Sequence, residues 1–312
     1  MTRQAFPRRV ETIHVPPIKC QGIKTKLVPF IATNIQWDGR GRWIEPFLGS
    51  GVVALNLGPT EARLSDTNRH VIELYRAIQT GRITHLTVRE SLKEMGECLR
   101  KEGEKYFYDV REHFNESHDP LDLLFLNRSC FNGVMRFNGK GRYNVPFGKK
   151  TERFRQAHVT KIVNQVRWLQ SVLKCNRWQL KCCDWRESLA EARAGDFVYL
   201  DPPYIGRHAD YFNRWSDADA VALAQTCSRL PCGFALSMWQ ENRYRKNSHI
   251  DEFWSGTTVR TYQHFYHIGP TESLRNSMIE ALVIREGFAA PESSEAAEDG
   301  GRRQGSVQTS LF

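Results

Sequence analysis

Strand-like and helix-like segments alternate along most of this chain, and that alternation constrains the fold more than any other feature. The first unit reads as a strand, a glycine turn and a helix in "RWIEPFLGSGVVALNLG". Later strands are predicted in "ARLSDTN", "GDFVYLDPPY" and "CGFALSMW", and the chain closes on a strand pair in "TVRTYQHFYHI" and "MIEALVIRE". Strands that alternate with helices indicate an α/β sheet.

Helical segments are predicted from apolar residues at helical spacing and from residues that can cap a helix. They lie in "DVREHF", "DPLDLLFLNRSCFN", "TKIVNQVRWLQSVLK" and "SDADAVALAQTCSRL". Asp119 or Asp122 can cap the second of these helices, and Ser216 can cap the last. The stretch 69–150 interrupts the alternation, because it is mostly helical and then rich in Gly and Asn. We therefore expect a discontinuous main domain over residues 1–68 and 151–287, an insertion over 69–150, and a disordered tail over 288–312.

Composition narrows the classes of protein to consider. The chain has 312 residues and a formal net charge of +9, and its last segment, from Phe288, is net acidic, so the rest is more basic still. Such an excess favours a polyanionic partner, most simply nucleic acid. No apolar run approaches the ~20 residues of a membrane helix, and the basic N-terminus lacks the apolar core of a signal peptide, which predicts a cytoplasmic protein. The eight cysteines show no CxxC spacing, which predicts free thiols and no metal site.

The stretch "EPFLGSGVVALN" places Gly49 and Gly51 between a strand and an apolar helix. Glycine allows positive φ angles and lets a ligand approach the backbone closely. In open parallel sheets, ligands bind at the carboxyl ends of strands, and Asp66 at the end of the next strand is placed to accept hydrogen bonds from ribose hydroxyls. Pyrophosphate would favour a longer glycine run. A short turn beside an acid therefore suits a ligand with ribose and no phosphate, such as S-adenosylmethionine.

The apolar strand "FVYL" runs into the sequence Asp201-Pro202-Pro203-Tyr204. The prolines fix φ and remove two N–H donors, which leaves the Asp201 carboxylate and the Pro202 carbonyl as acceptors beside the Tyr204 ring. Acceptors next to a flat ring suit a planar molecule with an amino group, such as a nucleobase. Hydrogen bonds to both amino protons would turn the nitrogen lone pair toward an electrophile, here the methyl sulfonium of S-adenosylmethionine. A base in duplex DNA would first have to be flipped out of the helix.

With these two motifs in this order, the chain resembles the Dam-type DNA adenine N6-methyltransferases, the D12 class. The motif "EPFLGSG" matches the family's cofactor signature and "DPPY" its catalytic signature. The block "YDVREHFNESHDPLDLLFLNRSCFNGVMRFNGKGRYNVPFGK" resembles its target-recognition insertion, and the resemblance runs from about Ile18 to Glu286. It implies a Rossmann-like methyltransferase sheet with an inserted, mainly helical recognition subdomain, and methyl transfer from S-adenosyl-L-methionine to the amine of a flipped adenine.

The resemblance also implies which residues bind the cofactor. The segment "IKCQGIK" matches a family segment that usually ends Gly-Gly-Lys, although Ile23 replaces the second glycine. Asp184 in "CCDW" matches an aspartate near the cofactor adenine, with Trp185 as the aromatic residue beside it. The expected cofactor ligands are Lys19, Lys24, Glu45, Pro46, Phe47, Gly49, Gly51, Asp66, Asn68, Asp184, Trp185 and Asp201. The expected catalytic residues are Asp201, Pro202, Pro203 and Tyr204.

For DNA, the resemblance implies a recognition loop inside the insertion. Phe131 and Asn132 match a pair placed near the extruded base or the gap that it leaves, and Arg136 matches an arginine that reads a guanine. Lys150 stands where the family's best-known members have an aromatic residue, so the recognition sequence is left open. The expected DNA-binding residues are Asn127, Arg128, Phe131, Asn132, Arg136, Asn138, Lys140, Arg142, Asn144, Pro146, Lys149 and Lys150.

The residues alone leave two alternatives open. The same chemistry could act on cytosine N4 in DNA or on adenine in RNA, or the fold could serve a non-catalytic DNA-binding regulator. The intact "DPPY" favours an enzyme. The expected partner is double-stranded DNA, bound by a monomer, with a cognate restriction endonuclease as a candidate second partner and no membrane.

Overall fold

Seven strands form one sheet in the computed structural model, which describes residues 4–203, 215–242, 247–267 and 275–292. Their order is β3-β2-β1-β4-β5-β7-β6. The strands from β3 to β5 pair parallel, and β7 runs antiparallel to β5 and β6. The strands are β1 (Trp43–Glu45), β2 (Glu61–Asp66), β3 (Arg177–Cys182), β4 (Phe197–Leu200), β5 (Gly233–Asn242), β6 (Thr257–His267) and β7 (Arg275–Arg285). The predicted α/β fold and closing strand pair are confirmed.

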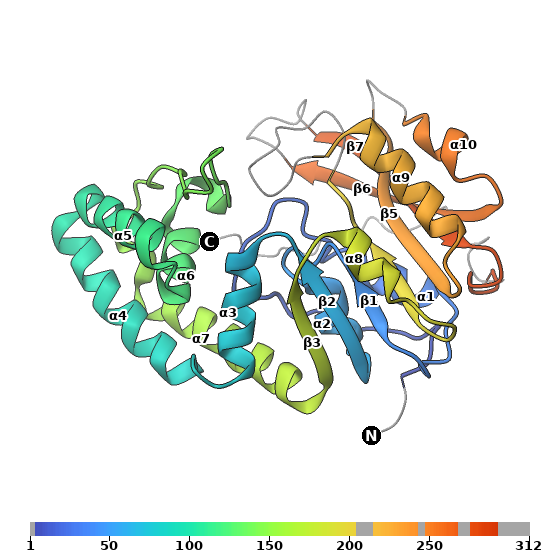
Figure 1. Cartoon of the computed structure of the whole chain (residues 1–312). Coiled ribbons are helices and arrows are strands. Elements are labelled where there is room, and N and C mark those ends of the chain that lie inside the picture. Colours follow the sequence, from blue (N-terminus) through green and yellow to red (C-terminus); the bar gives the residue numbers. More distant parts are fainter. Residues whose placement is uncertain (1–3, 204–214, 243–246, 268–274, 293–312) are drawn as a thin grey trace, which may run out of the picture.

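Helices cover both faces of this sheet (Figure 1). α8 (Trp185–Ala190) and α9 (Asp217–Ser228) lie in front of it, and α2 (Val52–Leu57) lies behind it. α1 (Val28–Asn34) belongs to the same buried cluster as α2, and α10 (His249–Phe253) follows β5 near α9. The sheet is therefore enclosed on both sides, which suits parallel strands made of continuous apolar residues.

The strand β4 shows how the sequence divides its side chains between the two faces. Phe197 and Tyr199 join the larger buried cluster with α1, α2 and α3, whereas Val198 and Leu200 join the second cluster with α8 and α9. Successive strand residues point to opposite faces, so an uninterrupted apolar run is needed when both faces are covered. The carboxyl end of β4 consequently emerges from the middle of the core.

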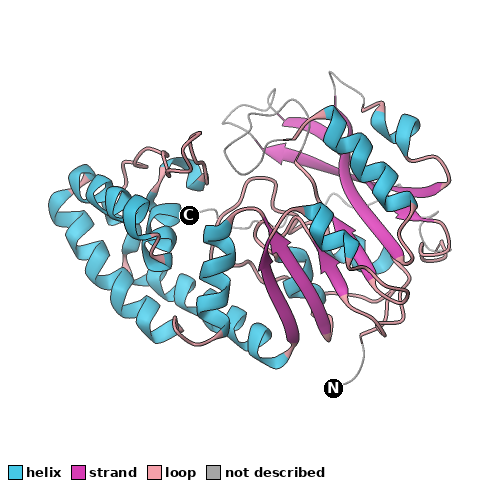
Figure 2. Ribbon diagram, viewed as in Figure 1, coloured by secondary structure: helices cyan, strands magenta, loops and turns pink. Residues whose placement is uncertain are grey.

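A group of helices stands beside the sheet, where Figure 2 shows helix with no strand. It contains α4 (His85–Glu102), α5 (Glu104–Ser117), α6 (Pro120–Ser129) and α7 (Gln156–Cys175), with short turns at Phe131–Gly133 and Thr151–Phe154. α3 (Arg69–Gln79) joins this group to the sheet, because Arg76 donates to the Leu180 carbonyl at 2.8 Å and Gln79 donates to the Trp178 carbonyl at 2.9 Å. The division of the chain at residues 69 and 151 stays a prediction.

Local signals account for several of these boundaries. Asp119 caps α6 by accepting from the Leu121 N–H at 2.7 Å, and Ser216 forms a reciprocal capping box with Asp219. The edge strand β3 escaped prediction, because its alternation of buried and exposed residues covers only a few positions. Among the described residues, no helix is both long and apolar enough to cross a membrane. Most of the predicted disordered tail, residues 293–312, lies outside the described residues.

Candidate active site

The predicted catalytic corner, Asp201 to Pro203 (hereafter the catalytic corner), follows directly from the buried strand β4. The Asp201 side chain is 24% exposed, and its Oδ1 lies 2.9 Å from Nζ of Lys24, whose side chain is 6% exposed. The same ammonium group donates to the Gly22 carbonyl at 3.2 Å. Lys24 was expected among the cofactor ligands, and the structure pairs it with the expected catalytic carboxylate. Tyr204, the remaining expected catalytic residue, lies outside the described residues.

The protonation of Asp201 is governed by opposing influences. Burial raises its pKa, the Lys24 ammonium and its hydrogen bond lower it, and Glu280 raises it again. Glu280 lies on β7 and is almost completely buried. Sequence reasoning did not select Glu280, although a single acid inside the apolar run "MIEALVI" was a usable signal.

Glu45, at the end of β1, is a second buried acid at this edge of the sheet. Its Oε2 accepts from Nε1 of Trp43 at 2.9 Å and from the Ala54 N–H at 3.1 Å. Burial raises the pKa of Glu45 to about 8, and Asp201 contributes to the increase while the two hydrogen bonds oppose it. The Glu45 carboxyl group is therefore mostly protonated at neutral pH.

The glycine turn has the geometry that the sequence required. Gly49 and Gly51 have φ angles of 50° and 69°, in the left-handed region that favours glycine. A Cβ on Gly51 would lie 3.1 Å from a methyl group of Leu48, whereas a Cβ on Gly49 would meet nothing within 4 Å. The Asp66 carboxylate accepts from the Gly49 N–H and the Asn68 N–H, both at 2.8 Å. Asp66 thus ties the end of β2 to the turn, and Gly49 borders open space.

The other expected cofactor ligands differ in how far they are buried. Pro46 is buried and Phe47 is half-buried. Asp184 caps α8 by accepting from the Arg186 N–H at 2.9 Å, and Trp185 is buried with the Arg186 guanidinium 4.3 Å from its ring centre. Asn68 caps α3 in the same manner. These contacts frame the edge of the sheet, and the roles of these residues as ligands stay predictions.

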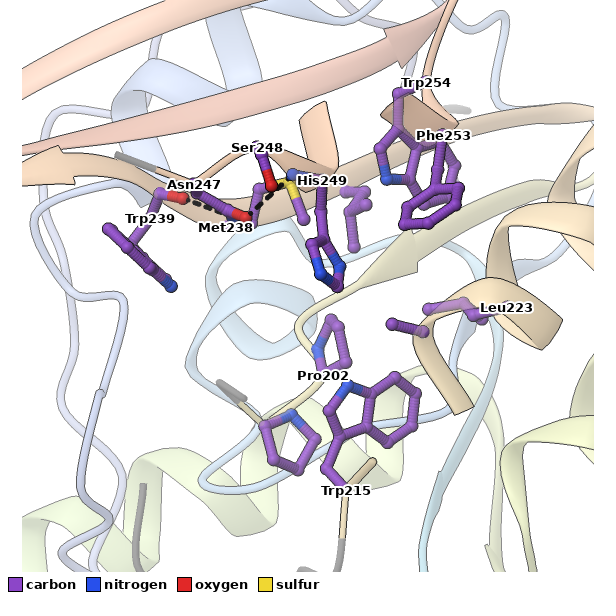
Figure 3. A pocket seen from close by; sticks show the side chains of 13 residues that line it. Pro202, Trp215, Leu223, Met238, Trp239, Asn247, Ser248, His249, Phe253 and Trp254 are labelled. Carbon is purple, nitrogen blue, oxygen red and sulfur yellow. Dashed lines mark hydrogen bonds between the residues drawn. The ribbon is translucent and has the colours of Figure 1, made fainter. Parts of the chain in front are cut away.

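A cavity of about 370 Å³ opens beside the catalytic corner (Figure 3). Pro202 and Pro203 line it, and His249 points toward Pro202 from α10. The other walls are mainly aromatic and apolar, and include Trp215, Leu223, Met238, Trp239, Phe253 and Trp254. The paired Asp201 and Lys24 are not among the residues that line this aromatic cavity.

Lys19 and Asn127 join the N-terminal segment to the insertion. The Lys19 N–H donates to Oδ1 of Asn127 at 2.7 Å, and Nδ2 of Asn127 donates to the Lys19 carbonyl at 2.9 Å. Asn127 is fully buried, and the Lys19 side chain covers Gly133. Burial lowers the pKa of Lys19 to about 8, with further contributions from Arg153 and Arg128. The structure thus places Lys19 beside expected DNA ligands, and its role as a cofactor ligand and that of Asn127 in DNA binding stay predictions.

The recognition loop, residues 131–150, presents several expected DNA ligands at the surface. Phe131 is 55% exposed, and Asn132 beside it has a φ angle of 54°. Nε of Arg136 donates to Oδ1 of Asn144 at 2.9 Å, which holds the exposed guanidinium in one orientation. Asn138 organises the following turn by accepting from two backbone N–H groups. The exposed positions further along are Lys140, Pro146, Lys149 and Lys150.

Beneath this surface lies a core of aromatic residues. Phe137, Tyr143 and Phe147 are buried, and the Phe137 and Tyr143 rings meet edge-on at 5.5 Å. Arg128 lies partly beneath the loop and donates to the Pro17 carbonyl at 3.0 Å, and burial lowers its pKa to about 10. The interleaved basic and aromatic residues of the sequence therefore separate into an outer charged layer and an inner apolar one.

Similarity to known proteins agrees with this arrangement. The family model of the D12 class N6 adenine-specific DNA methyltransferases matches residues 21–268. A DNA adenine methylase from Serratia marcescens is 33% identical over 197 residues, which cover 60% of this chain and 68% of that protein. A DNA adenine methylase from Vibrio cholerae serotype O1 is 32% identical over 252 residues, which cover 77% and 86%. The chain belongs to the D12 class of N6 adenine-specific DNA methyltransferases.

Proposed function

We propose that this chain methylates N6 of an adenine flipped out of duplex DNA, with S-adenosylmethionine as the methyl donor and the catalytic corner as the reaction centre. DNA methyltransferases of this kind generally use that donor. The observation that carries the proposal is the Asp201 carboxylate, held 2.9 Å from Lys24 at the end of a buried strand. The neighbouring strand β1 leads directly into the glycine turn.

The residues around the turn fit the donor. When bound, S-adenosylmethionine supplies a methyl group on a sulfonium sulfur, which keeps the electron pair of the broken S–C bond. The Asp66 and Asp201 carboxylates lie at this edge of the sheet, which suits a cationic ligand, and the mostly protonated Glu45 carboxyl group adds no charge there at neutral pH. Gly49 leaves open space above the turn for the approach of the ligand.

The catalytic corner orients the amine of the adenine. Asp201 and the Pro202 carbonyl accept hydrogen bonds from the two N6–H groups and aim the nitrogen lone pair at the methyl carbon. As N6 takes the methyl group it becomes positively charged, and Asp201 stabilises that charge at short range in a partly buried site. The surplus proton then leaves N6 to water, which balances the reaction. The aromatic cavity beside Pro202 offers a flat apolar surface to a base that has left the helix.

The insertion supplies recognition. The exposed cations of the recognition loop suit phosphate contacts, and the fixed guanidinium of Arg136 suits a guanine edge. The proposed division of labour assigns residues 69–150 to recognition and residues 1–68 with 151–287 to catalysis. We infer a monomer acting on double-stranded DNA. A cognate restriction endonuclease and a cytoplasmic location stay predictions from the sequence.

Substitution of Asp201 tests the proposal. Asp201→Ala should reduce methyl transfer by roughly 10²–10⁴-fold, because the amine loses its orienting acceptor. Mass spectrometry of nucleosides from treated DNA and RNA measures N6-methyladenine directly, and calorimetry checks that S-adenosylmethionine still binds. Asp38→Ala, at an exposed aspartate that pairs with Arg40, serves as the control. Undiminished activity in Asp201→Ala, or N4-methylcytosine as the product of the unaltered protein, would refute the proposal.

A further inference from the structure

Glu280 is a buried carboxyl group that the proposed reaction does not yet use. Its side chain is 2% exposed. β7 pairs antiparallel with β5, so that Leu282 lies opposite Ser237 and Glu280 lies opposite Trp239. β5 in turn pairs parallel with β4. Glu280 thus sits two strands away from the strand that carries the catalytic corner.

The alternation of side chains puts Glu280 on the same face of the sheet as Asp201. The hydroxyl groups of Tyr199 and Ser237 meet at 2.8 Å, which fixes the face that these two residues share. Asp201 follows Tyr199 by two residues, so it returns to that face. Glu280 precedes Leu282 by two residues, and Leu282 is the partner of Ser237 in the ladder. The carboxyl groups therefore face the same layer of the protein, where Lys24 enters.

Four groups face Asp201 from the described elements packed around it. Lys24 approaches from the segment before α1, at 2.9 Å. Glu45 stands at the end of β1, Tyr199 lies on β4 and Glu280 lies on β7. Lys24 is the cation of this set, and it favours the ionised form of Asp201, whereas Glu280 acts in the opposite direction. Neighbouring strands are about 4.8 Å apart, so the backbones of β4 and β7 lie roughly 10 Å apart.

We propose that Glu280 is a positioning residue for methyl transfer: it opposes Lys24 and so sets how strongly the Asp201 carboxylate holds protons. This inference rests on the proposed function, because it concerns the residue that accepts a hydrogen bond from the adenine amine. A carboxylate with a greater proton affinity accepts a stronger hydrogen bond and better stabilises the positive charge that develops on N6. Lys24 keeps the same carboxylate from being neutralised outright. Lys24 thus favours the charged form of Asp201, and Glu280 adds to its affinity for a proton.

Titration of Asp201 tests the inference without cofactor or DNA. The protein is labelled with ¹³C at its aspartate carboxyl groups, and Asp201→Asn identifies the resonance by its loss. In Glu280→Gln the pKa of Asp201 should fall, because the substitution removes the carboxyl group that raises it. Glu61→Gln is the matched control at a surface glutamate of β2, and it should leave the titration of Asp201 unchanged.

Two further variants separate the charge of Glu280 from its packing. Glu280→Met also removes the charge, and apolar replacements of buried charges often keep or raise stability, so this variant serves if Gln impairs folding. Glu280→Asp keeps the charge. The Gln and Met variants should share the lowered pKa of Asp201, and the Asp variant should stay near the unaltered protein. An unchanged Asp201 titration in both neutral variants would overturn the inference.

Activity provides a second readout. The acid limb of kcat/KM for DNA, measured at saturating S-adenosylmethionine, should move to lower pH in Glu280→Gln by the same amount as the Asp201 titration. A shift in the titration without a shift in the limb would contradict a role in the reaction. Failure of the proposed function is distinguishable, because the unaltered protein would then produce no N6-methyladenine while the titration could still be measured.

Discussion

The catalytic corner and the recognition loop handle charge in opposite ways. At the corner, Asp201 pairs with the nearly buried Lys24, and the buried acids Glu45 and Glu280 act on Asp201. In the loop, exposed cations lie over a buried aromatic core. Chemistry on an amine needs charges at fixed distances in a poorly hydrated site, where each is worth more. Contact with a DNA backbone needs cations that water and salt can reach, and the proposed roles of the two regions divide along that line.

The same contrast applies to ion pairs. Lys24 and Asp201 lie 2.9 Å apart with little exposure, and neither can recover full hydration if its partner is removed. Arg142 and Glu112 lie 2.5 Å apart with 42% and 53% of their side chains exposed. Exposed pairs of this kind contribute little to stability, because water screens them and replaces the lost partner. Distance alone therefore does not rank these two interactions, and burial does.

The largest effect is expected from Lys24→Ala, which leaves Asp201 without its cation. We expect a loss of roughly 3 kcal/mol in the free energy of unfolding at pH 7, because a mostly buried carboxylate then lacks compensation. Urea unfolding of both proteins measures the difference. The double variant Lys24→Ala with Asp201→Asn should recover much of the stability. A loss under about 1 kcal/mol would show that the Lys24–Asp201 pair contributes no more than an exposed ion pair does, which would contradict the contrast between the two regions.

The next effect concerns Glu45 and depends on pH. Its folded-state pKa of about 8 lies above the ordinary value of 4.5, so between these values the unfolded chain releases a proton that the folded chain keeps. The stability contributed by Glu45 is therefore complete below about pH 4.5 and is lost as pH rises to about 8. Glu45→Gln should remove this decline and raise stability at pH 8 by an amount on the order of a few kcal/mol.

Unfolding curves collected between pH 5 and pH 9 measure this effect. Glu61→Gln, at a half-exposed glutamate that pairs with Arg177, is the control and should follow the unaltered protein. Parallel pH profiles for Glu45→Gln and the unaltered protein would mean that Glu45 is ionised in the folded state. In that case the corner would carry one more negative charge than proposed, and the contrast with the recognition loop would become sharper.

Alanine substitutions at the two glycines of the turn should affect stability and cofactor affinity in opposite order. Gly51→Ala should cost about 1–2 kcal/mol of stability, because its φ angle is 69° and its new methyl group would lie 3.1 Å from Leu48. Gly49→Ala adds a methyl group in open space, so it should cost less stability but weaken S-adenosylmethionine binding more. Thermal unfolding and calorimetry measure the two quantities. Equal losses of cofactor affinity would place the ligand away from Gly49.

Much of this arrangement was predictable from short stretches of sequence, and the rest depends on contacts between distant ones. The α/β fold and the glycine turn follow from local apolar runs and from glycines that need positive φ. The pairing of Lys24 with Asp201 does not, because it joins the N-terminal segment to the end of β4. Glu280 reaches the same face only through the order of β4, β5 and β7. Burial of Phe137 under the loop likewise required the packed helices.

Removal of loop cations should give a smaller effect that depends on salt. Lys140→Ala and Lys150→Ala together should make the salt dependence of DNA affinity shallower, by a slope of about 0.9 for each lysine that contacts a phosphate. Turnover at saturating DNA should not change, because neither lysine reaches the corner. Fluorescence anisotropy at several salt concentrations measures the slope, with Lys105→Ala as a control at an exposed lysine of α5. A fall in turnover at saturating DNA would mean that the loop lysines also affect the reaction step, and not only DNA affinity.

The smallest effect is expected from the exposed pair of Arg142 and Glu112. It tests whether an ion pair in the recognition loop is as weak as its exposure predicts. A double-mutant cycle with Arg142→Ala and Glu112→Ala should give a coupling energy of about 0.2–1 kcal/mol, which declines as salt is raised. The corresponding cycle at Lys24 and Asp201 should give a larger value with weaker dependence on salt, because buried charges are screened less. A coupling above about 2 kcal/mol at Arg142 would mean that the recognition loop is held by charge as firmly as the corner. Burial would then not be what separates the two regions, and the rigidity of the loop itself would have to contribute to recognition.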